Sequence, residues 1–240
     1  MNVIFSLMEF AIRANKNNNE KRGRIKMIVT KQAPGFTATA VMPDNSIKEI
    51  SLSDYKGKKV VLFFYPLDFT FVCPTELLAF DHRLKEFEKR GVQVLGCSID
   101  SEFSHLAWKN TEIKSGGIGN VQYPIIADLD KSIARSFDVL IESEEVTIIT
   151  EDTEELTSVR GTVALRGSFL IDEEGIVRHA VINDLPLGRN IDEMLRMVDA
   201  LSFHQEHGEV CPAGWQEGDE GMADTTEGVA TYLSEHGDKL

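Results

Sequence analysis

A cysteine lies where an apolar run gives way to an amphipathic segment, a position at which a thiol can become a nucleophile. Residues 58–65 are mostly β-branched, aromatic or otherwise apolar, which predicts a strand buried on both faces. Cys73 follows this run directly before Pro74, and proline is favoured at the first position of a helix. Unpaired N–H groups and the helix dipole lower the pKa of a cysteine at a helix start from about 8.5 to between roughly 3.5 and 7.5. We therefore expect Cys73 to form a thiolate.

The sequence has no second cysteine close to Cys73 that could form a redox pair with it. A thioredoxin-type site has a second cysteine three positions after the first, and here that position is Glu76. Cys97 lies inside an apolar, strand-like run, where a free cysteine behaves as a small hydrophobic residue, so we favour a structural role for it. Cys211 lies in a polar, turn-rich segment, where an exposed and mobile thiol can meet an oxidised partner.

Metal binding is an alternative role for Cys211. The spacing His204-x2-His207-x3-Cys211 could hold zinc, although no fourth ligand is apparent. Both histidines follow the predicted end of a helix, where histidines commonly interact with free carbonyl groups. We favour redox chemistry over metal binding for this segment.

An activated thiol without a nearby second cysteine could serve acyl transfer or attack a peroxide. Acyl transfer requires a base, and no histidine lies in the segment around Cys73. Peroxide attack requires donors that polarise an O–O bond. Thr70 supplies a hydroxyl, Pro66 supplies an apolar wall without an N–H, and Arg166 is the leading cation because it follows the apolar residues 163–165. A salt bridge from Arg166 to Glu76 is the competing structural role, and the two roles can coexist.

Composition and charge limit the class of protein. A chain of 240 residues with 42% hydrophobic content can bury one substantial core, which indicates a globular domain with extensions. The 25 basic and 39 acidic residues give a net charge of −14, which argues against nucleic acid or an anionic membrane as a partner. No apolar run reaches the roughly 18 to 20 residues that span a bilayer. Three scattered cysteines suggest a reducing compartment, and we expect a cytoplasmic location.

Strand-like and helical segments alternate along the chain. The predicted strands are residues 36–41, 47–52, 58–65, 92–99, 121–127, 163–171 and 176–182, and the predicted helices are a segment from Pro74 and residues 101–110, 131–137 and 190–203. They include a β-α-β unit and a late antiparallel hairpin. This order predicts an α/β fold of the thioredoxin-like type, with a central mixed sheet flanked by helices.

The chain divides into three predicted parts. Residues 1–26 are expected to form a disordered extension, because charge follows the apolar part instead of preceding it as in a secretory signal. Residues 27–203 form the domain, and residues 204–240 form a C-terminal arm. An acidic insertion at about residues 142–160 has seven acidic and no basic residues between 142 and 155. The sequence leaves two possible structures for this insertion, an extended hairpin and a loose loop.

The pattern Pro66-x3-Thr70-x2-Cys73 resembles the active-site signature of the typical two-cysteine peroxiredoxins. The resemblance covers most of residues 28–217. It continues in Ser104-His105-Leu106-Ala107-Trp108, Leu165-Arg166-Gly167, Asn183-Asp184-Leu185-Pro186-Leu187-Gly188-Arg189 and Val210-Cys211-Pro212-Ala213-Gly214-Trp215.

This resemblance implies a role for each candidate residue. Cys73 would be the peroxidatic thiolate, Thr70, Pro66 and Arg166 would form the peroxide pocket, and Cys211 of the other subunit would be the resolving thiol. The implied protein is a homodimer, often assembled into a ring of five dimers. Thioredoxin or a flavoprotein disulfide reductase would restore its thiols, with no bound metal or organic cofactor. The helix start at Cys73 would have to unwind for the two sulfurs to meet.

Two other functions compete with peroxide reduction. A holdase chaperone in a high-order oligomer is the main alternative, and the acidic insertion could enlarge its surface. A general disulfide reductase is disfavoured by Glu76 at the position where the second cysteine would lie.

Sensitivity to over-oxidation is a further expectation. Residues 116–119, Gly-Gly-Ile-Gly, resemble a loop motif of peroxide-sensitive members, whereas Tyr232-Leu233 replaces the Tyr-Phe usual in their C-terminal helix. We expect intermediate sensitivity. Leu233 is smaller than phenylalanine, so the C-terminal helix covers the Cys73 helix less and lets it unwind sooner.

Overall fold

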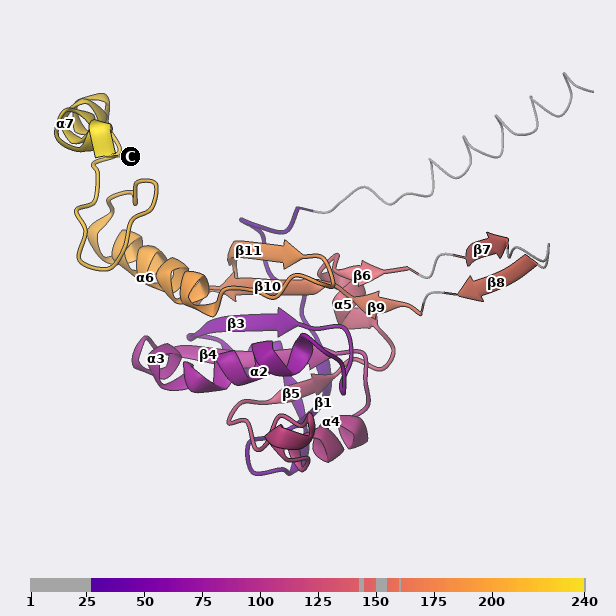
Figure 1. Ribbon diagram of the computed structural model, residues 1–240. Coiled ribbons are helices and arrows are strands. Elements are labelled where there is room, and N and C mark those ends of the chain that lie inside the picture. Colours follow the sequence, from indigo (N-terminus) through magenta and orange to yellow (C-terminus); the bar gives the residue numbers. More distant parts are fainter. Residues whose placement is uncertain (1–26, 143–144, 150–154, 160, 240) are drawn as a thin grey trace, which may run out of the picture.

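The computed structural model describes residues 27–142, 145–149, 155–159 and 161–239. Its body is a seven-stranded mixed sheet with the order β11-β10-β3-β4-β5-β1-β2, and helices cover the sheet (Figure 1). The predicted α/β fold with a central mixed sheet is confirmed. The prediction for residues 1–26 lies outside the described residues.

The elements follow the predicted alternation. The strands are β1 (Thr37–Val41), β2 (Ile47–Ser51), β3 (Lys59–Phe64), β4 (Val92–Ser98), β5 (Ile125–Ala127), β6 (Leu140–Ile141), β7 (Glu145–Ile149), β8 (Glu155–Val159), β9 (Val163–Ala164), β10 (Arg166–Ile171) and β11 (Val177–Asn183). The helices are α2 (Cys73–His82), α3 (Leu84–Lys89), α4 (Glu102–Lys109), α5 (Ser132–Ser136), α6 (Ile191–His207) and α7 (Thr226–His236), and short 3-10 turns occur at η1 (Leu52–Tyr55), η2 (Ile113–Ser115) and η3 (Gly237–Lys239).

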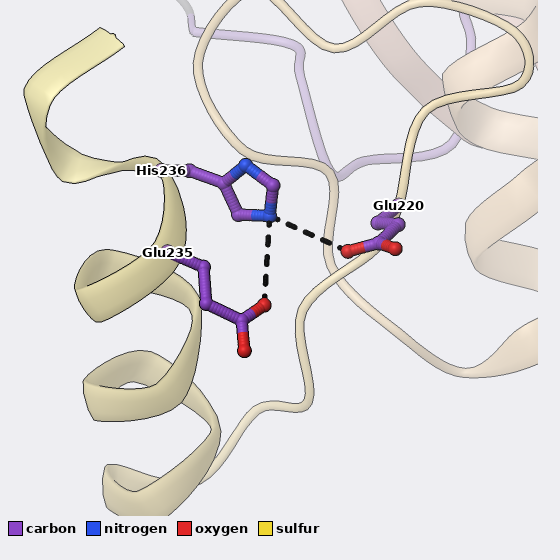
Figure 2. A group of neighbouring side chains, drawn as sticks. All are labelled: Glu220, Glu235 and His236. Carbon is purple, nitrogen blue, oxygen red and sulfur yellow. Dashed lines mark hydrogen bonds and ion pairs between the residues drawn. The ribbon is translucent and has the colours of Figure 1, made fainter.

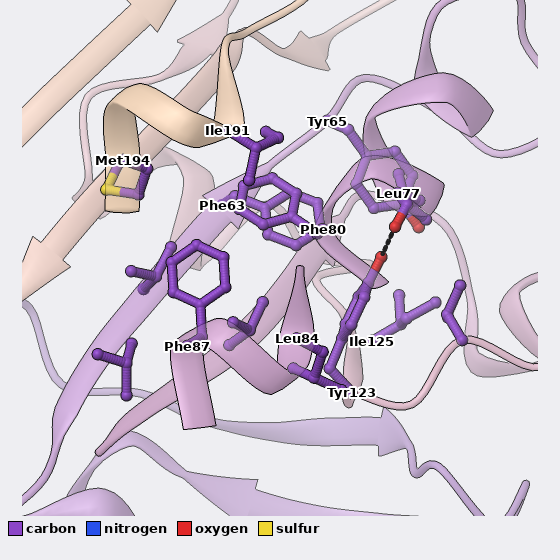
Figure 3. Packing of buried hydrophobic residues seen from close by; sticks show 14 of the residues in the cluster. Phe63, Tyr65, Leu77, Phe80, Leu84, Phe87, Tyr123, Ile125, Ile191 and Met194 are labelled. Carbon is purple, nitrogen blue, oxygen red and sulfur yellow. Dashed lines mark hydrogen bonds between the residues drawn. The ribbon is translucent and has the colours of Figure 1, made fainter. Parts of the chain in front are cut away.

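The central strand β3 fixes the position of α2. All six residues of β3 are buried, and the strand runs parallel to β4 and antiparallel to β10. On one face of the sheet the ring of Phe63 stacks on Phe80 of α2, with ring centroids 4.0 Å apart, and Phe87 of α3 extends the cluster (Figure 3). Burial of each such side chain contributes about 1.5–3 kcal/mol. This packing holds the start of α2 at the carboxyl end of β3.

Two predicted strands are shorter or broken in the structure. The strand predicted over 121–127 is limited to β5, since Pro124 has no N–H with which to extend the pairing. The run 163–171 is divided into β9, which pairs with β6, and β10, which pairs with β3 and β11. A tight turn in which the Gly167 N–H donates to the Leu165 carbonyl separates them. As a result, Arg166 is the first residue of β10.

Two segments extend from the body. Strands β7 and β8 pair antiparallel and project beyond β6 and β9 (Figure 1), which favours the hairpin over the loose loop for the acidic insertion. Helix α6 continues to His207 instead of ending at Phe203, and Gly208 ends it in the left-handed conformation with φ 72°. The arm then leads to α7, which lies away from the sheet (Figure 1). No helix in the described part of the chain is long and apolar enough to cross a membrane.

Candidate active site at Cys73

Cys73 is the first residue of α2 and is fully buried. The helix thus begins one residue earlier than the predicted start at Pro74. The Val72 carbonyl accepts hydrogen bonds from the Thr75 and Glu76 N–H groups at 3.0 and 3.4 Å and from the Thr75 hydroxyl at 2.6 Å. These bonds close the first turn around the sulfur. Cys73 therefore lies at the positive end of the helix, as the sequence predicts.

Arg166 contacts both Cys73 and Glu76. Its Nη1 donates to Cys73 Sγ at 3.4 Å and to Glu76 Oε2 at 2.6 Å, and its Nε donates to the Leu185 carbonyl at 2.6 Å. The side chain is almost entirely buried, so these three acceptors fix the guanidinium. Both predicted contacts of Arg166 are present in one geometry.

A second arginine, Arg189, shares the same carboxylate. Its backbone N–H and Nε donate to Glu76 Oε1 at 2.9 and 2.8 Å, and its Nη2 donates to Oε2 at 3.0 Å. Its Nη1 donates to the Gly167 carbonyl and the Ser168 hydroxyl. Sequence reasoning assigned no role to Arg189, although it ends one of the motifs that carry the resemblance. An arginine next to a glycine and just before a helix was the available signal.

The two arginines of this cluster share a single carboxylate. Glu76 is the only ion-pair partner of Arg166 and Arg189 among the described residues. Burial raises the pKa of Glu76, but the hydrogen bonds and charge of Arg189, with the charge of Arg166, outweigh burial and leave that pKa below its ordinary value. Two buried cations therefore share one carboxylate beside Cys73.

Pro66 and Thr70 lie on the loop between β3 and α2. Pro66 is buried beside the sheet, as expected for an apolar wall. The Thr70 hydroxyl donates to the Leu67 carbonyl at 2.9 Å, which is its one hydrogen bond in the described part of the chain. Phe69 has φ 53°, a left-handed conformation that costs a non-glycine residue on the order of 1–3 kcal/mol. The loop brings Pro66 and Thr70 next to the helix start, but Thr70 does not bond to Cys73.

A buried polar group holds this loop. The Asp68 carboxylate accepts from the Tyr65 hydroxyl at 2.8 Å and lies 2.8 Å from His105 Nδ1, while His105 Nε2 lies 3.2 Å from the Ile126 carbonyl. Both ring nitrogens therefore face an oxygen atom of the protein. The Asp68 N–H donates to Asp100. Burial, followed by the charge of Asp68, raises the pKa of Asp100. Sequence reasoning identified none of these residues as a site.

The other two cysteines lie in different surroundings. Cys97 is fully buried in β4, and burial raises its pKa well above the ordinary value, followed by the charge of Asp128. Cys211 is half-buried beyond α6, and its thiol donates to the Ala200 carbonyl at 3.4 Å. The arm leaves the body at the end opposite the start of α2 (Figure 1), so a single chain does not bring Cys211 to Cys73.

The zinc alternative for Cys211 finds no support. His204 and His207 lie inside α6, where their Nδ1 atoms are 2.7 and 3.1 Å from the carbonyls of Glu209 and Phe203. Within the described ranges, the one close group of three ligand-type side chains is Glu220, Glu235 and His236 (Figure 2). Its imidazole lies 3.3 and 3.9 Å from the two carboxylates, so these contacts join α7 to the arm.

Comparisons with known proteins place these features in context. The model of the AhpC/TSA family matches residues 29–180, and that of the C-terminal domain of 1-Cys peroxiredoxin matches residues 200–235. Alkyl hydroperoxide reductase C of Helicobacter pylori strain J99 is 56% identical over 216 residues, which cover 89% of this chain and 100% of that protein. Peroxiredoxin-1 of Gekko japonicus is 49% identical over 208 residues, covering 87% and 96% of the two chains. The structure of reduced 2-Cys peroxiredoxin from Plasmodium vivax matches with a TM-score of 0.77 at 45% identity, covering 87% of this chain and 100% of that one.

Proposed function

The chain belongs to the AhpC/TSA family and is a thiol-dependent peroxidase, and on this premise we propose that Cys73 is its peroxidatic cysteine and Cys211 its resolving cysteine. One observation supports the assignment of Cys73 as the peroxidatic cysteine. The Arg166 guanidinium donates to Cys73 Sγ within a buried cluster whose charge a thiolate completes. Cys97 is a poor candidate, because burial raises the pKa of its thiol well above the ordinary value and no arginine donates to its sulfur among the described residues.

The proposed reaction has two steps. The Cys73 thiolate attacks one oxygen of a hydroperoxide, an S–O bond forms, the O–O bond breaks, and the departing oxygen takes a proton and leaves as water or an alcohol. The Cys211 thiolate then attacks the Cys73 sulfur, a disulfide forms, and hydroxide leaves as water. Arg166 stabilises the thiolate and the charge that develops on the oxygens. Pro66 and Thr70 shape the pocket, with the Thr70 hydroxyl turning from Leu67 toward the peroxide.

The second step requires movement and a second subunit. Cys73 has no exposed surface, so the first turn of α2 has to open before its sulfur can be attacked. The arm that follows α6 leaves the body at the end opposite the start of α2 (Figure 1), which supports delivery of Cys211 from a partner subunit. Strand β11 is an edge of the sheet and offers unpaired backbone groups for a homodimer. Phe71, which is 96% exposed, with Phe69 and Phe103 offers an apolar surface for assembling dimers into a decamer.

We also propose an electron donor and a cellular location for this protein. Thioredoxin or a flavoprotein disulfide reductase would reduce the disulfide in the cytoplasm, supported by the reducing compartment that three unpaired cysteines suggest. The holdase alternative is not favoured, since the assembled site at Cys73 and the relatives named alkyl hydroperoxide reductase and peroxiredoxin point to peroxide reduction.

Peroxide consumption by single-cysteine variants tests these assignments. Cys73→Ser should abolish turnover. Cys211→Ser should form one sulfenic acid per chain, detected by dimedone labelling and mass spectrometry, and should form no disulfide. Cys97→Ser is the matched control and should retain turnover. Turnover in Cys73→Ser, or a disulfide in Cys211→Ser, would contradict the assignments.

A further inference from the structure

An arginine that the proposed peroxide chemistry does not use holds the arm that carries Cys211. Arg196 lies on α6, and its Nε and Nη2 donate to the two carboxylate oxygens of Glu193, both at 2.7 Å. Its Nη1 donates to the Trp215 carbonyl at 2.8 Å. The paired contact with Glu193 fixes the plane of the guanidinium. The remaining nitrogen is thereby aimed at the backbone of the arm, four residues after Cys211.

The segment that Arg196 holds is a folded turn. The Trp215 N–H donates to the Pro212 carbonyl at 3.2 Å, and the indole N–H donates to the Asp219 carbonyl at 3.1 Å. The indole is only 4% exposed and packs against Phe203 of α6 with ring centroids 4.9 Å apart. The Cys211 thiol faces α6 through its bond to Ala200. A displacement of Trp215 would therefore move Cys211.

Arg196 is also a source of positive charge for this thiol. Residues 197–238 contain no lysine or arginine, so the arm between α6 and its last residues has no such cation of its own. Burial raises the pKa of Cys211, and the charge of Arg196 acts in the opposite direction. The Arg196 charge thus favours the thiolate of Cys211.

Other charged groups near Cys211 are engaged elsewhere. Arg178, His179 and His204 line the same pocket of about 310 Å³ as Cys211. Arg178 donates to Asp172 at 2.6 Å, and His204 Nδ1 lies 2.7 Å from the Glu209 carbonyl. Burial lowers the pKa of His179, which favours its neutral form. Arg196 is left as the cation that contacts the turn of Cys211.

We propose that Arg196 is a positioning residue for the resolving step. Held by Glu193, it keeps the Cys211–Trp215 turn on α6 and places a positive charge beside the thiol. This inference rests on the proposed role of Cys211 as the resolving cysteine. The step itself is unchanged: the Cys211 thiolate displaces hydroxide from the Cys73 sulfenic acid, and no further reactant is needed.

The test measures the two steps of the reaction separately in the Arg196→Gln variant. Reduced protein is mixed with one equivalent of hydrogen peroxide, and Cys73 oxidation and disulfide formation are followed separately from about pH 6 to pH 9, a range chosen around the ordinary thiol pKa. We expect an unchanged rate of Cys73 oxidation. Disulfide formation should slow at neutral pH and recover at higher pH, because less Cys211 is ionised without the charge of Arg196. Sulfinic acid at Cys73 should increase, because the sulfenic acid lives longer.

Three variants serve as controls. Arg196→Lys keeps the charge and should restore most of the rate at neutral pH. Glu193→Gln keeps the arginine but frees its guanidinium, so it should give an intermediate rate. Arg135→Gln removes a half-exposed arginine on α5 and should behave like the unmodified protein.

Two results would overturn the inference. One is a wild-type rate and pH profile of disulfide formation in Arg196→Gln. The other is an equal slowing in Arg196→Gln and Arg196→Lys with no change in pH profile and a lower melting temperature, which would indicate a structural role alone. If Cys211→Ser still forms the disulfide, the proposed function fails instead, which distinguishes the two failures.

Discussion

Cys73 and Cys211 lie in contrasting parts of the molecule. Cys73 is buried among charged groups that connect α2, β10 and the segment before α6. Cys211 is half-buried on an arm, where its turn is held by Arg196, the Trp215 indole, a weak thiol contact and the backbone pairing of Val210 with Met222. The difference assigns the attack on peroxide to the packed body and the supply of the second thiol to the arm. It also predicts that substitutions in the two regions affect different steps.

The largest effect should come from removing the cation at Cys73. Arg166→Met should lower the rate of Cys73 oxidation by about 100- to 1000-fold, the usual loss when one donor that stabilises developing charge is removed. Disulfide formation from any sulfenic acid that does form should be affected less. Stopped-flow fluorescence or competition with a second peroxidase measures the first step. A loss smaller than about tenfold, well below that expected range, would contradict the role given to Arg166.

The carboxylate between the two arginines should matter for stability. Glu76→Gln should lower the free energy of unfolding at neutral pH by about 3 kcal/mol, because it removes the one carboxylate that pairs with both buried guanidiniums. The pKa of Glu76 is lowered in the folded state, so its contribution is present above the unfolded value of about 4.3 and is lost as the pH falls through the folded value. Urea denaturation at several pH values should show this acid loss in the wild type and not in the variant.

These residues also show what the sequence can predict. Cys73, Pro66 and Thr70 are close in the chain, so their spacing indicates a shared site, and Arg166 was identified because an arginine at the end of an apolar strand needs a partner. Arg189 and the pair Asp68–His105 act through contacts between distant segments. Their partners depend on how β10, α4 and α6 pack, which the local pattern does not contain. Arg196 looks like an ordinary surface residue until the arm folds against it.

A modest effect is expected from the C-terminal helix. α7 lies at the end of the arm (Figure 1), and Leu233 is half-exposed, so any cover on α2 would come from another subunit. Leu233→Phe should stabilise the folded start of α2 and raise the fraction of sulfinic acid at Cys73 by about twofold, equivalent to roughly 0.5 kcal/mol. Mass spectrometry after graded peroxide exposure measures this fraction. An unchanged fraction would contradict the idea that α7 covers the start of α2.

The smallest effect on the reaction should occur at the third cysteine. Burial keeps the pKa of Cys97 well above the ordinary value, so iodoacetamide at neutral pH should label Cys211 and leave Cys97 unlabelled in the folded protein. Cys97→Ala should cost about 1 kcal/mol of stability through the small cavity it creates and should leave turnover unchanged. Rapid labelling of Cys97 in native protein would show that β4 opens more readily than its burial implies.

Mixing two inactive chains tests most directly whether Cys73 and Cys211 form a pair between subunits. Cys73→Ser and Cys211→Ser proteins carrying different mass tags are dissociated, mixed, reassembled and treated with one equivalent of hydrogen peroxide. The account predicts a disulfide-linked dimer with one chain of each kind, joined through Cys73 of one and Cys211 of the other, while neither protein alone forms it. Absence of this mixed dimer, or a link through Cys97, would contradict the account.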